Sequence, residues 1–273
     1  MDDWIRAAIQ EDAPAGDVTT ESVLVGDPFS LMEWTAKSDL IVCGLFVGAR
    51  VFRLIDEKCE VKTALPEGEA VEAGRLVLAI KGPARALLTG ERVALNVVQH
   101  MSGVATLTRK YVDAAAGTGA KIAATRKTTP LMRRLEKYAV TVGGGAPHRF
   151  SLSDGVLIKD NHIAMAGGIT EAVKRARDKA HHLLKIQVEV TSVEEGREAV
   201  EAGADLLLLD NMSTAAMSEA VAALKGKAVL EASGNMGLDR VREVAETGVD
   251  FISVGALTHS VIAADISARM KPE

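Results

Sequence analysis

Short apolar runs alternate with amphipathic stretches through the second part of the chain. Six runs of strand length follow one another after residue 120, and most are followed by a stretch with apolar residues at helical spacing. The six runs are KIAATR, GVLIKD, KIQVEV, DLLLLD, AVLEASG and FISVGA. Repeated β-then-α units with continuously apolar strands predict a parallel sheet covered by helices, either closed into a barrel or doubly wound.

The first part of the chain has a different texture. It opens on an amphipathic helix that ends at AGDVTT, and strand-like segments follow from about residue 29, with a short helix at GARVFRLIDEK between them. Residues 86–116 then predict helix, with an interruption near Ser102 and Gly103. This order is typical of an α+β unit that precedes the β-then-α series.

Polar side chains gather where the six apolar runs end. The groups at these ends are Arg126 and Lys127, then Lys159 to His162, then Glu189, then Asp210 and Asn211, then Ser233 and Gly234, then Gly255. In a parallel barrel the carboxyl ends of the strands meet on one face, where barrel enzymes have their active sites. We therefore expect these residues to form one site.

The last two strand ends carry small residues instead of charges. LEASGN and SVGAL each lead through a glycine into a helical pattern. Loops after the final strands of a barrel commonly bind phosphate, because their backbone N–H groups point toward the ligand. Glycine at such a turn also serves plain backbone geometry, so the phosphate site rests on the two turns together.

Two carboxylates, Glu189 and Asp210, interrupt the otherwise basic set of strand ends. Beside a phosphate site, carboxylates hold hydrated Mg²⁺, bind sugar hydroxyls or stabilise a developing positive charge. The alternative is an internal salt bridge to Lys159 or Lys127.

Composition narrows the class of ligand. The 273 residues carry a net charge of −5, which argues against a broad nucleic-acid or anionic-membrane surface. Basic residues nevertheless concentrate between residues 126 and 162. They are Arg126, Lys127, Arg133, Arg134, Lys137, His148, Arg149, Lys159 and His162. A basic cluster in an acidic protein suits a small ligand with several negative charges, carboxylates as well as phosphates.

The expected cellular location follows from the lack of a membrane-spanning run and of a secretory signal. No apolar run reaches the roughly 18 to 20 residues that span a bilayer, and the first residues are acidic where a secretory signal is basic. Cys43 and Cys59 are too far apart for a CxxC pair and lie among apolar residues. We expect a cytoplasmic protein with two buried thiols.

Several long motifs resemble those of the quinolinate phosphoribosyltransferase family. They are EDAPAGDVTT, GERVALNVVQHMSGVAT, TRKTTPLMRRLEKYAVTVGGGAPHR, LSDGVLIKDNHI, VEV, LLLDNM, LEASGN and GVDFISVGALTHS. The resemblance implies an α/β fold with an N-terminal α/β sandwich-like domain over residues 1–106 and an incomplete, open α/β barrel over residues 107–273. It implies a type II phosphoribosyltransferase that converts quinolinate and phosphoribosyl pyrophosphate, with Mg²⁺, into nicotinate mononucleotide, pyrophosphate and CO₂ in NAD biosynthesis.

The resemblance also implies residue roles. Arg126, His148, Arg149 and Lys159 match the groups that hold the quinolinate carboxylates, and Lys127 lies between quinolinate and the pyrophosphate. Catalytic roles fall to Lys127, Lys159, Glu189 and Asp210, with Mg²⁺ held by substrate and water near the two carboxylates. The further substrate-binding residues are Thr125, Ser233, Gly234, Asn235 and Gly255, the last four as the 5′-phosphate cradle. His162 and His259 are expected near the site. Members form dimers or hexamers, and Arg92 corresponds to an arginine that completes the neighbouring subunit's site.

Three positions depart from the commoner pattern of the family. Ala124 stands where an acid often precedes TRKT, and Leu131 and Asn235 stand where glycine is common. The changes near the substrate loop put its conformation in question more than its chemistry.

Three other functions compete with this assignment. The first is a molybdenum-transport-associated relative of the same architecture, which lacks the Glu91-Arg92 and Lys159 to His162 patterns. The second is a sugar-phosphate aldolase or isomerase barrel, in which Lys159 would form a Schiff base. The third is a non-catalytic anion-binding protein, which the number of converging charges disfavours, because unpaired buried charges reduce stability.

Overall fold

The computed structural model describes residues 1–272, and the chain forms two compact units. One contains Met1–Leu107 together with the segment from Val261 onward. The other contains Thr108–Ser260. Each unit is described by itself.

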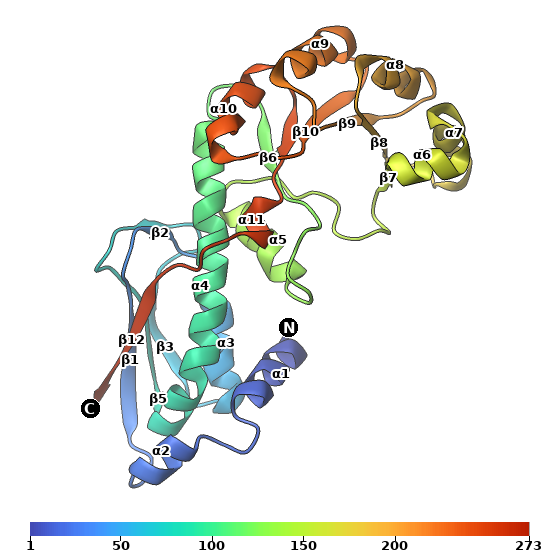
Figure 1. Ribbon diagram of the computed structural model, residues 1–273. Coiled ribbons are helices and arrows are strands. Elements are labelled where there is room, and N and C mark those ends of the chain that lie inside the picture. The colour runs from blue at the N-terminus through green and yellow to red at the C-terminus, as the bar shows by residue number, and fades with distance from the viewer. Residues whose placement is uncertain (273) are drawn as a thin grey trace. The chain divides into compact units, whose positions relative to one another are not determined.

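The first unit is built on an antiparallel sheet with strand order β12-β1-β5-β3 (Figure 1). Its strands are β1 (Phe29–Ala36), β3 (Glu60–Ala64), β5 (Leu76–Pro83) and β12 (Ile266–Pro272). A small pair, β2 (Leu40–Ile41) and β4 (Ala70–Val71), stands apart from it. Alternate residues of β1 are buried, as the period of a strand with one covered face requires. Trp34 from this face contacts Phe52 edge to face, with ring centroids 6.0 Å apart.

The helices of the first unit begin with α1 (Asp2–Asp12), α2 (Val18–Val23) and α3 (Leu45–Ile55). The first helix ends before AGDVTT, as expected, and α2 begins inside that segment because the Asp17 side chain accepts a hydrogen bond from the Thr20 N–H and caps a new helix. Glycines let α3 pack closely: a Cβ at Gly48 would lie 2.9 Å from Val98 and 3.1 Å from Trp34.

The long helix α4 (Ala84–Ala114) runs without the expected interruption at Ser102 and Gly103. The Ser102 hydroxyl is buried and bonds both the N–H and the carbonyl of Cys43, at 3.1 Å each. A Cβ at Gly103 would lie 2.4 Å from the carbonyl oxygen of Ile262. The prediction of a break was wrong because these two residues serve packing contacts within a continuous helix.

The second unit contains a six-stranded parallel sheet with order β6-β11-β10-β9-β8-β7. The strands are β6 (Lys121–Ala123), β7 (Val156–Ile158), β8 (Ile186–Val190), β9 (Leu206–Asp210), β10 (Val229–Ser233) and β11 (Phe251–Ser253). All five pairs are parallel, and β6 and β7 form the two edges of the sheet among the described residues. This open arrangement agrees with the predicted incomplete α/β barrel.

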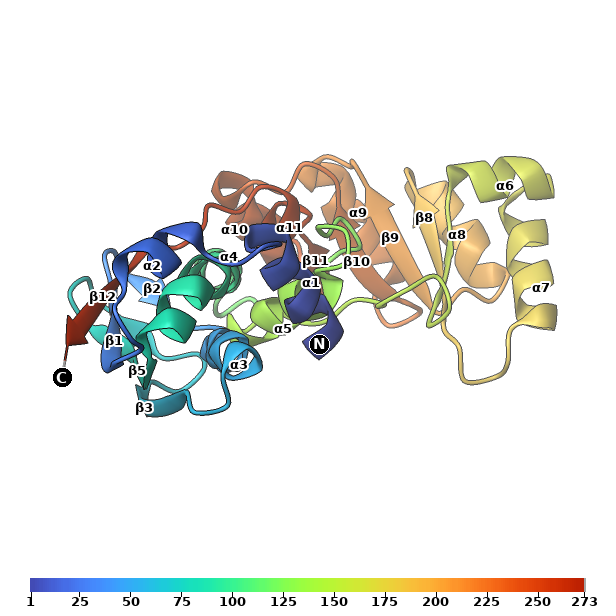
Figure 2. The same cartoon turned by 90° about the horizontal axis from the view of Figure 1, so that it is seen from below.

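Helices connect the parallel strands, and α7 to α10 lie along the outer side of the sheet (Figure 1). The connecting helices are α5 (Arg133–Val142), α6 (Asp160–Ala166), α7 (Ile169–Lys179), α8 (Val193–Glu201), α9 (Thr214–Leu224) and α10 (Leu238–Glu246), and the short helix α11 (Ala256–His259) follows the last parallel strand. The helices α7 to α10 contact strands β7, β8, β10 and β11, and Figure 2 shows β8, β9 and β10 side by side. Residues on the helix side of the strands, such as Leu207, Leu209 and Ile252, are fully buried.

The last described strand belongs to the first unit. Strand β12 pairs antiparallel with β1, from Ser30 opposite Pro272 to Ala36 opposite Ile266. The expected domain boundary, with residues 107–273 in the barrel, differs from this arrangement at its far end. The difference arises because an edge of the β1 sheet is completed by residues that follow the whole parallel sheet in sequence.

No helix among residues 1–272 is both long and apolar enough to cross a membrane.

Candidate active site

A cavity of about 1050 Å³ lies in the second unit, where the parallel strands end. Of the thirteen site residues expected from the sequence, all but Arg92 line it. These are Thr125, Arg126, Lys127, His148, Arg149, Lys159, Glu189, Asp210, Ser233, Gly234, Asn235 and Gly255. Arg92 is exposed on α4 in the first unit. The strand ends therefore meet at one place, as the parallel topology predicts.

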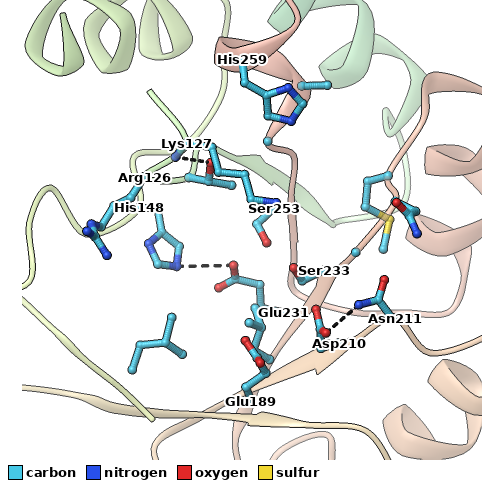
Figure 3. A pocket seen from close by; sticks show the side chains of 18 of the residues that line it. Arg126, Lys127, His148, Glu189, Asp210, Asn211, Glu231, Ser233, Ser253 and His259 are labelled. Carbon is cyan, nitrogen blue, oxygen red and sulfur yellow. Dashed lines mark hydrogen bonds and ion pairs between the residues drawn. The ribbon is translucent and has the colours of Figure 1, made fainter. Parts of the chain in front are cut away.

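Strand register determines which side chains share the cavity. Leu208 on β9 is aligned with Glu189 on β8 and with Glu231 on β10, and Asp210 is aligned with Ser233. Because side chains two residues apart on a strand point to the same face, these polar groups all belong to the inner face of the sheet. Figure 3 shows Glu189, Asp210, Glu231 and Ser233 turned toward the same space.

Lys159 enters the cavity from the end of β7. It is the N-cap residue of α6, and its side chain forms an ion pair with Glu189. Its backbone N–H donates to Nδ1 of His162 at 3.0 Å, so His162 fixes the turn and is not among the cavity-lining residues. The salt bridge considered for Glu189 from the sequence is therefore present, and it links two of the predicted site residues.

Burial weakens the charged form of several bases around the cavity. The pKa of Arg149 is lowered by burial and by the nearby Arg126, while its Nη1 donates to the Gly155 carbonyl at 2.9 Å. The pKa of Lys137 is lowered to about 8 by burial and then by Arg133 and Arg126. The Lys137 ammonium donates to the His148 carbonyl at 2.9 Å. Crowded bases of this kind are stabilised when an anion enters between them.

The loop that carries Arg149 is fixed by Asp154. Its carboxylate accepts hydrogen bonds from the N–H groups of Phe150 at 2.5 Å and Ser151 at 2.6 Å. Burial acts to raise the Asp154 pKa, but these hydrogen bonds prevail and lower it to about 2. The carboxylate is therefore ionised at neutral pH, and the loop stays tied to the start of β7.

The turns after β10 and β11 leave no room for side chains. Gly234 has φ +91°, and a Cβ there would lie 2.2 Å from Oδ1 of Asn211. A Cβ at Gly255 would lie 2.9 Å from Cδ of Lys127 and 3.0 Å from Nε2 of His259. Both glycines therefore allow backbone to form the cavity wall, as a phosphate cradle requires.

The departures from the family pattern are accommodated locally. Leu131 (φ 65°) and Asn235 (φ 48°) adopt the left-handed conformation that glycine takes without strain. Ala124 is fully buried, and its N–H donates to the Ala146 carbonyl at 3.0 Å.

Sequence reasoning missed several lining residues, of which Glu231 is the most deeply buried acid, at 4% exposure. Its carboxylate accepts a hydrogen bond from Gln187 Nε2 at 2.8 Å and lies 3.5 Å from His148 Nε2 (Figure 3). The sequence held a signal for it, because Glu231 is two residues before Ser233 and so shares its face of the strand. Ser253 stands in the same relation to Gly255.

Tyr111 could not have been assigned from its sequence context. It reaches the cavity from α4, and its hydroxyl donates to the Met236 carbonyl at 3.1 Å. Asn211, which donates to Asp210 at 2.6 Å, and His259, which was expected near the site, also line the cavity.

Three buried polar atoms of the cavity have no hydrogen-bond partner among the described residues. They are Nε of Arg126, Nδ1 of His148 and Oε1 of Glu231. Most buried polar groups in proteins are hydrogen-bonded, so orphans gathered at one cavity indicate a site shaped for a polar ligand.

Comparison with known proteins identifies the family. The profile of the quinolinate phosphoribosyl transferase C-terminal domain matches residues 104–269, and that of the N-terminal domain matches residues 17–102. The chain belongs to the quinolinate phosphoribosyltransferase family. The resemblance seen in the sequence motifs is thereby confirmed over nearly the whole length.

Individual relatives of this family are similar along their full chains. The probable nicotinate-nucleotide pyrophosphorylase [carboxylating] of Bacillus subtilis is 43% identical over 257 residues, covering 94% of this chain and 89% of that protein. The human nicotinate-nucleotide pyrophosphorylase [carboxylating] is 38% identical over 275 residues, covering 99% and 90%. The crystal structure of NadC from Streptococcus pyogenes superposes with a TM-score of 0.96 at 39% identity, covering 100% of this chain and 96% of that one.

Proposed function

We propose that this protein transfers a phosphoribosyl group from phosphoribosyl pyrophosphate to quinolinate, with loss of CO₂, in NAD biosynthesis. The observation that carries this proposal is a cavity lined by a group of basic side chains, by two glycine turns and by the carboxylates of Glu189, Asp210 and Glu231. In the reaction the pyridine nitrogen bonds to the ribose carbon as the bond to pyrophosphate breaks. The adjacent carboxylate then leaves as CO₂, and a proton takes its place on the ring. The products are nicotinate mononucleotide, pyrophosphate and CO₂.

Quinolinate is assigned to the cationic end of the cavity. Arg126, His148, Arg149 and Lys159 line this end, and arginine binds carboxylates through two parallel hydrogen bonds. Quinolinate carries two adjacent carboxylates on one ring. They match a cluster in which burial lowers the pKa of Arg149 and His148, so that the charged forms of these bases are stabilised when an anion binds. Holding both reactants in register is worth roughly 7 to 11 kcal/mol of the barrier in well-oriented systems.

The phosphoribosyl donor is assigned to the other end. The turns at Ser233, Gly234, Asn235 and Gly255 receive the 5′-phosphate on backbone N–H groups, and Lys127 faces the leaving pyrophosphate. Glu189 and Asp210 are assigned to the ribose carbon, which becomes positively charged in an oxocarbenium-like transition state. Carboxylates in such a place stabilise that charge.

Mg²⁺ is included in the proposal as the cofactor. No cluster of three or more His, Cys, Asp or Glu side chains that could hold a metal occurs among residues 1–272. The donors present nevertheless fit Mg²⁺, which commonly takes one or two carboxylates together with water and substrate phosphates. Glu189 and Asp210 would hold it with the pyrophosphate group, and the bound ion would offset the charge of the leaving group.

A homodimer or hexamer is also part of the proposal, with Arg92 completing the site of a neighbouring subunit. Arg92 is exposed and does not line the cavity of its own chain. Mixing Arg92→Ala and Lys159→Ala proteins should restore part of the activity, because one site in a mixed dimer keeps both residues. Mass spectrometry shows whether the subunits have exchanged. If they have exchanged and no activity is restored, the shared site is contradicted.

The proposed reaction is tested with purified protein, quinolinate, phosphoribosyl pyrophosphate and Mg²⁺. Pyrophosphate and CO₂ should be released in equal amounts, and nicotinic acid should be a poor substitute because it lacks one carboxylate. A preference for nicotinic acid would overturn the assignment. Borohydride trapping of a covalent adduct on Lys159 would favour the aldolase alternative. The cytoplasmic location expected from the sequence remains part of this proposal.

A further inference from the structure

Glu231 has no part in the reaction as proposed above, although it lies beside His148, which is assigned to quinolinate. Glu231 is 4% exposed at the inner face of β10, and Gln187, 6% exposed on β8, donates to its Oε2. This hydrogen bond fixes the carboxylate with Oε1 toward His148 Nε2, at 3.5 Å. That distance is too long for a hydrogen bond in the structure, but it lies within reach of a small side-chain shift.

The charges around His148 oppose one another. Burial lowers its pKa most, and Lys137 from α5 and the adjacent Arg149 lower it further. Glu231 from β10 acts in the opposite direction, and so does the neighbouring side chain of Gln187 from β8. Arg126, at the end of β6, adds another positive charge to the same cavity wall. A dianion entering here neutralises the surrounding bases and adds negative charge beside the imidazole.

The unpartnered hydrogen-bonding atoms of this pair also favour a charged His148 in the complex. Oε1 of Glu231 lacks a hydrogen-bond partner, and so does Nδ1 of His148. A neutral imidazole donates from one nitrogen only, whereas an imidazolium donates from both. With one acceptor fixed by the protein and a second brought by a ligand carboxylate, only the imidazolium provides a donor for each.

We propose that Glu231, anchored by Gln187, is a positioning residue that converts His148 into a cationic binding group when a pyridine dicarboxylate enters the cavity. The proposal rests on the proposed function for the identity of that ligand. His148 is neutral in the free protein at pH 8, and binding transfers one proton from solvent to its ring. The affinity for quinolinate therefore falls as the pH rises, because proton uptake becomes less favourable.

The protonation state of His148 is measured by ¹⁵N NMR on protein labelled at histidine. Quinolinate is added alone and together with pyrophosphate, since neither mixture contains a ribose to transfer. The His148 signals are assigned with the His148→Gln variant. At pH 8 the ring should be neutral in the free protein and doubly protonated in the complex. A ring that stays neutral in the wild-type complex overturns the proposal without any variant.

Glu231→Gln removes the charge and preserves the shape of the side chain. In its quinolinate complex His148 should remain neutral at pH 8, and the KM for quinolinate should rise about tenfold, as a shift of one pKa unit implies. The KM for phosphoribosyl pyrophosphate should stay within about twofold, which separates positioning from a general loss of structure. Gln187→Met, which releases the Glu231 carboxylate, should act in the same direction with a smaller effect. A doubly protonated His148 in the Glu231→Gln complex contradicts the proposal.

Asp210→Asn is the matched control, since Asp210 is another carboxylate of the same cavity. It should impair turnover while leaving the protonation of His148 in the complex unchanged. Loss of proton uptake in this variant would show that Glu231 has no particular role. Absence of quinolinate turnover in the wild type would refute the proposed function, whereas turnover with a neutral His148 refutes this inference alone.

Discussion

The two ends of the cavity are built in different ways. At one end, Arg126 after β6, Arg149 on the loop before β7 and Lys159 after β7 supply positive charge from side chains. At the ends of β10 and β11, Gly234 and Gly255 clear space so that the backbone itself forms the wall. The shape and charge of the first end depend on the side chains that are present, whereas the shape of the second end depends on the absence of a side chain at the two glycines.

This difference changes what a substitution does. Side-chain charges pack against one another and must be balanced, which is why the Arg149 and Lys137 pKa values are lowered by burial and by neighbouring bases. A backbone cradle carries no such charge, so it can be damaged only by distorting the turn. Truncation should therefore be most harmful at the cationic end, and enlargement should be most harmful at the glycine end.

The largest effect is expected from Lys159→Ala. Removing the ammonium leaves Glu189, and the substrate carboxylate assigned to Lys159 in the proposal, without a partner. Truncating one member of a buried charge pair typically costs about 2–5 kcal/mol, or about 30- to 5000-fold in kcat/KM for quinolinate. The matched control is Lys185→Ala, because the Lys185 side chain is 75% exposed and its ammonium lies 3.6 Å from Asp205 Oδ1. Its kcat/KM should stay within about twofold. Equal losses in the two variants would show that the cavity charge is not decisive.

The crowding of positive charges at the cationic end can be tested by measuring how Lys137 affects the free energy of unfolding. Its folded pKa of about 8 lies below the unfolded value of 10.5, so between these pH values the unfolded state binds more protons. This group therefore makes the free energy of unfolding rise with pH across that window, by about 3 kcal/mol. Urea unfolding at pH 7.5 and 10 should show this rise in the wild type relative to Lys137→Met. Parallel changes with pH in the two proteins would mean that Lys137 is not destabilised by burial.

Gly234→Ala tests the glycine end. A Cβ would collide with Asn211, and the φ of +91° adds backbone strain, so the turn must move. Overpacking of this kind typically costs 1–3 kcal/mol, and we expect the KM for phosphoribosyl pyrophosphate to rise roughly tenfold. Gly226→Ala has a similar φ of +84° with nothing within 4 Å of the new methyl group. It should lose stability without a change in KM, and a similar KM defect in both would attribute the effect to strain alone.

Leu131→Gly should have the smallest effect. Leu131 is 88% exposed with φ 65°, and the left-handed conformation disfavours a branched side chain by about 1–2 kcal/mol. Glycine removes that strain but gains freedom in the unfolded chain, so we expect a net stabilisation below about 1 kcal/mol. Thermal unfolding would detect it, and a clear loss of stability would mean that the Leu131 side chain has a contact of its own.

The strand ends were predictable because a charge that follows a buried apolar run is unusual and marks the end of the strand. Lys159 and Asp210 were found in this way. Glu231 was overlooked because it stands inside its apolar run, although the period of two places it beside Ser233. Tyr111 lies on α4, which precedes the first parallel strand, and it carried no local signal because only tertiary packing brings its hydroxyl to Met236.

The helix and sheet boundaries show the same limit. Ser102 and Gly103 indicated a break because both residues disfavour helix interiors, yet contacts with Cys43 and Ile262 account for them. Strand β12 could not be assigned to the first unit from local pattern, because its partner β1 lies at the opposite end of the sequence.

The pairing of β1 with β12 has a consequence for the order of folding during synthesis. The residues of the parallel-sheet unit are contiguous, so this unit can begin to fold as soon as they leave the ribosome. The antiparallel sheet, in contrast, has an edge that stays unpaired until Ile266–Pro272 have been made. An open strand edge is a template for unwanted association, so β1 is the segment for which a nascent chain most needs a chaperone.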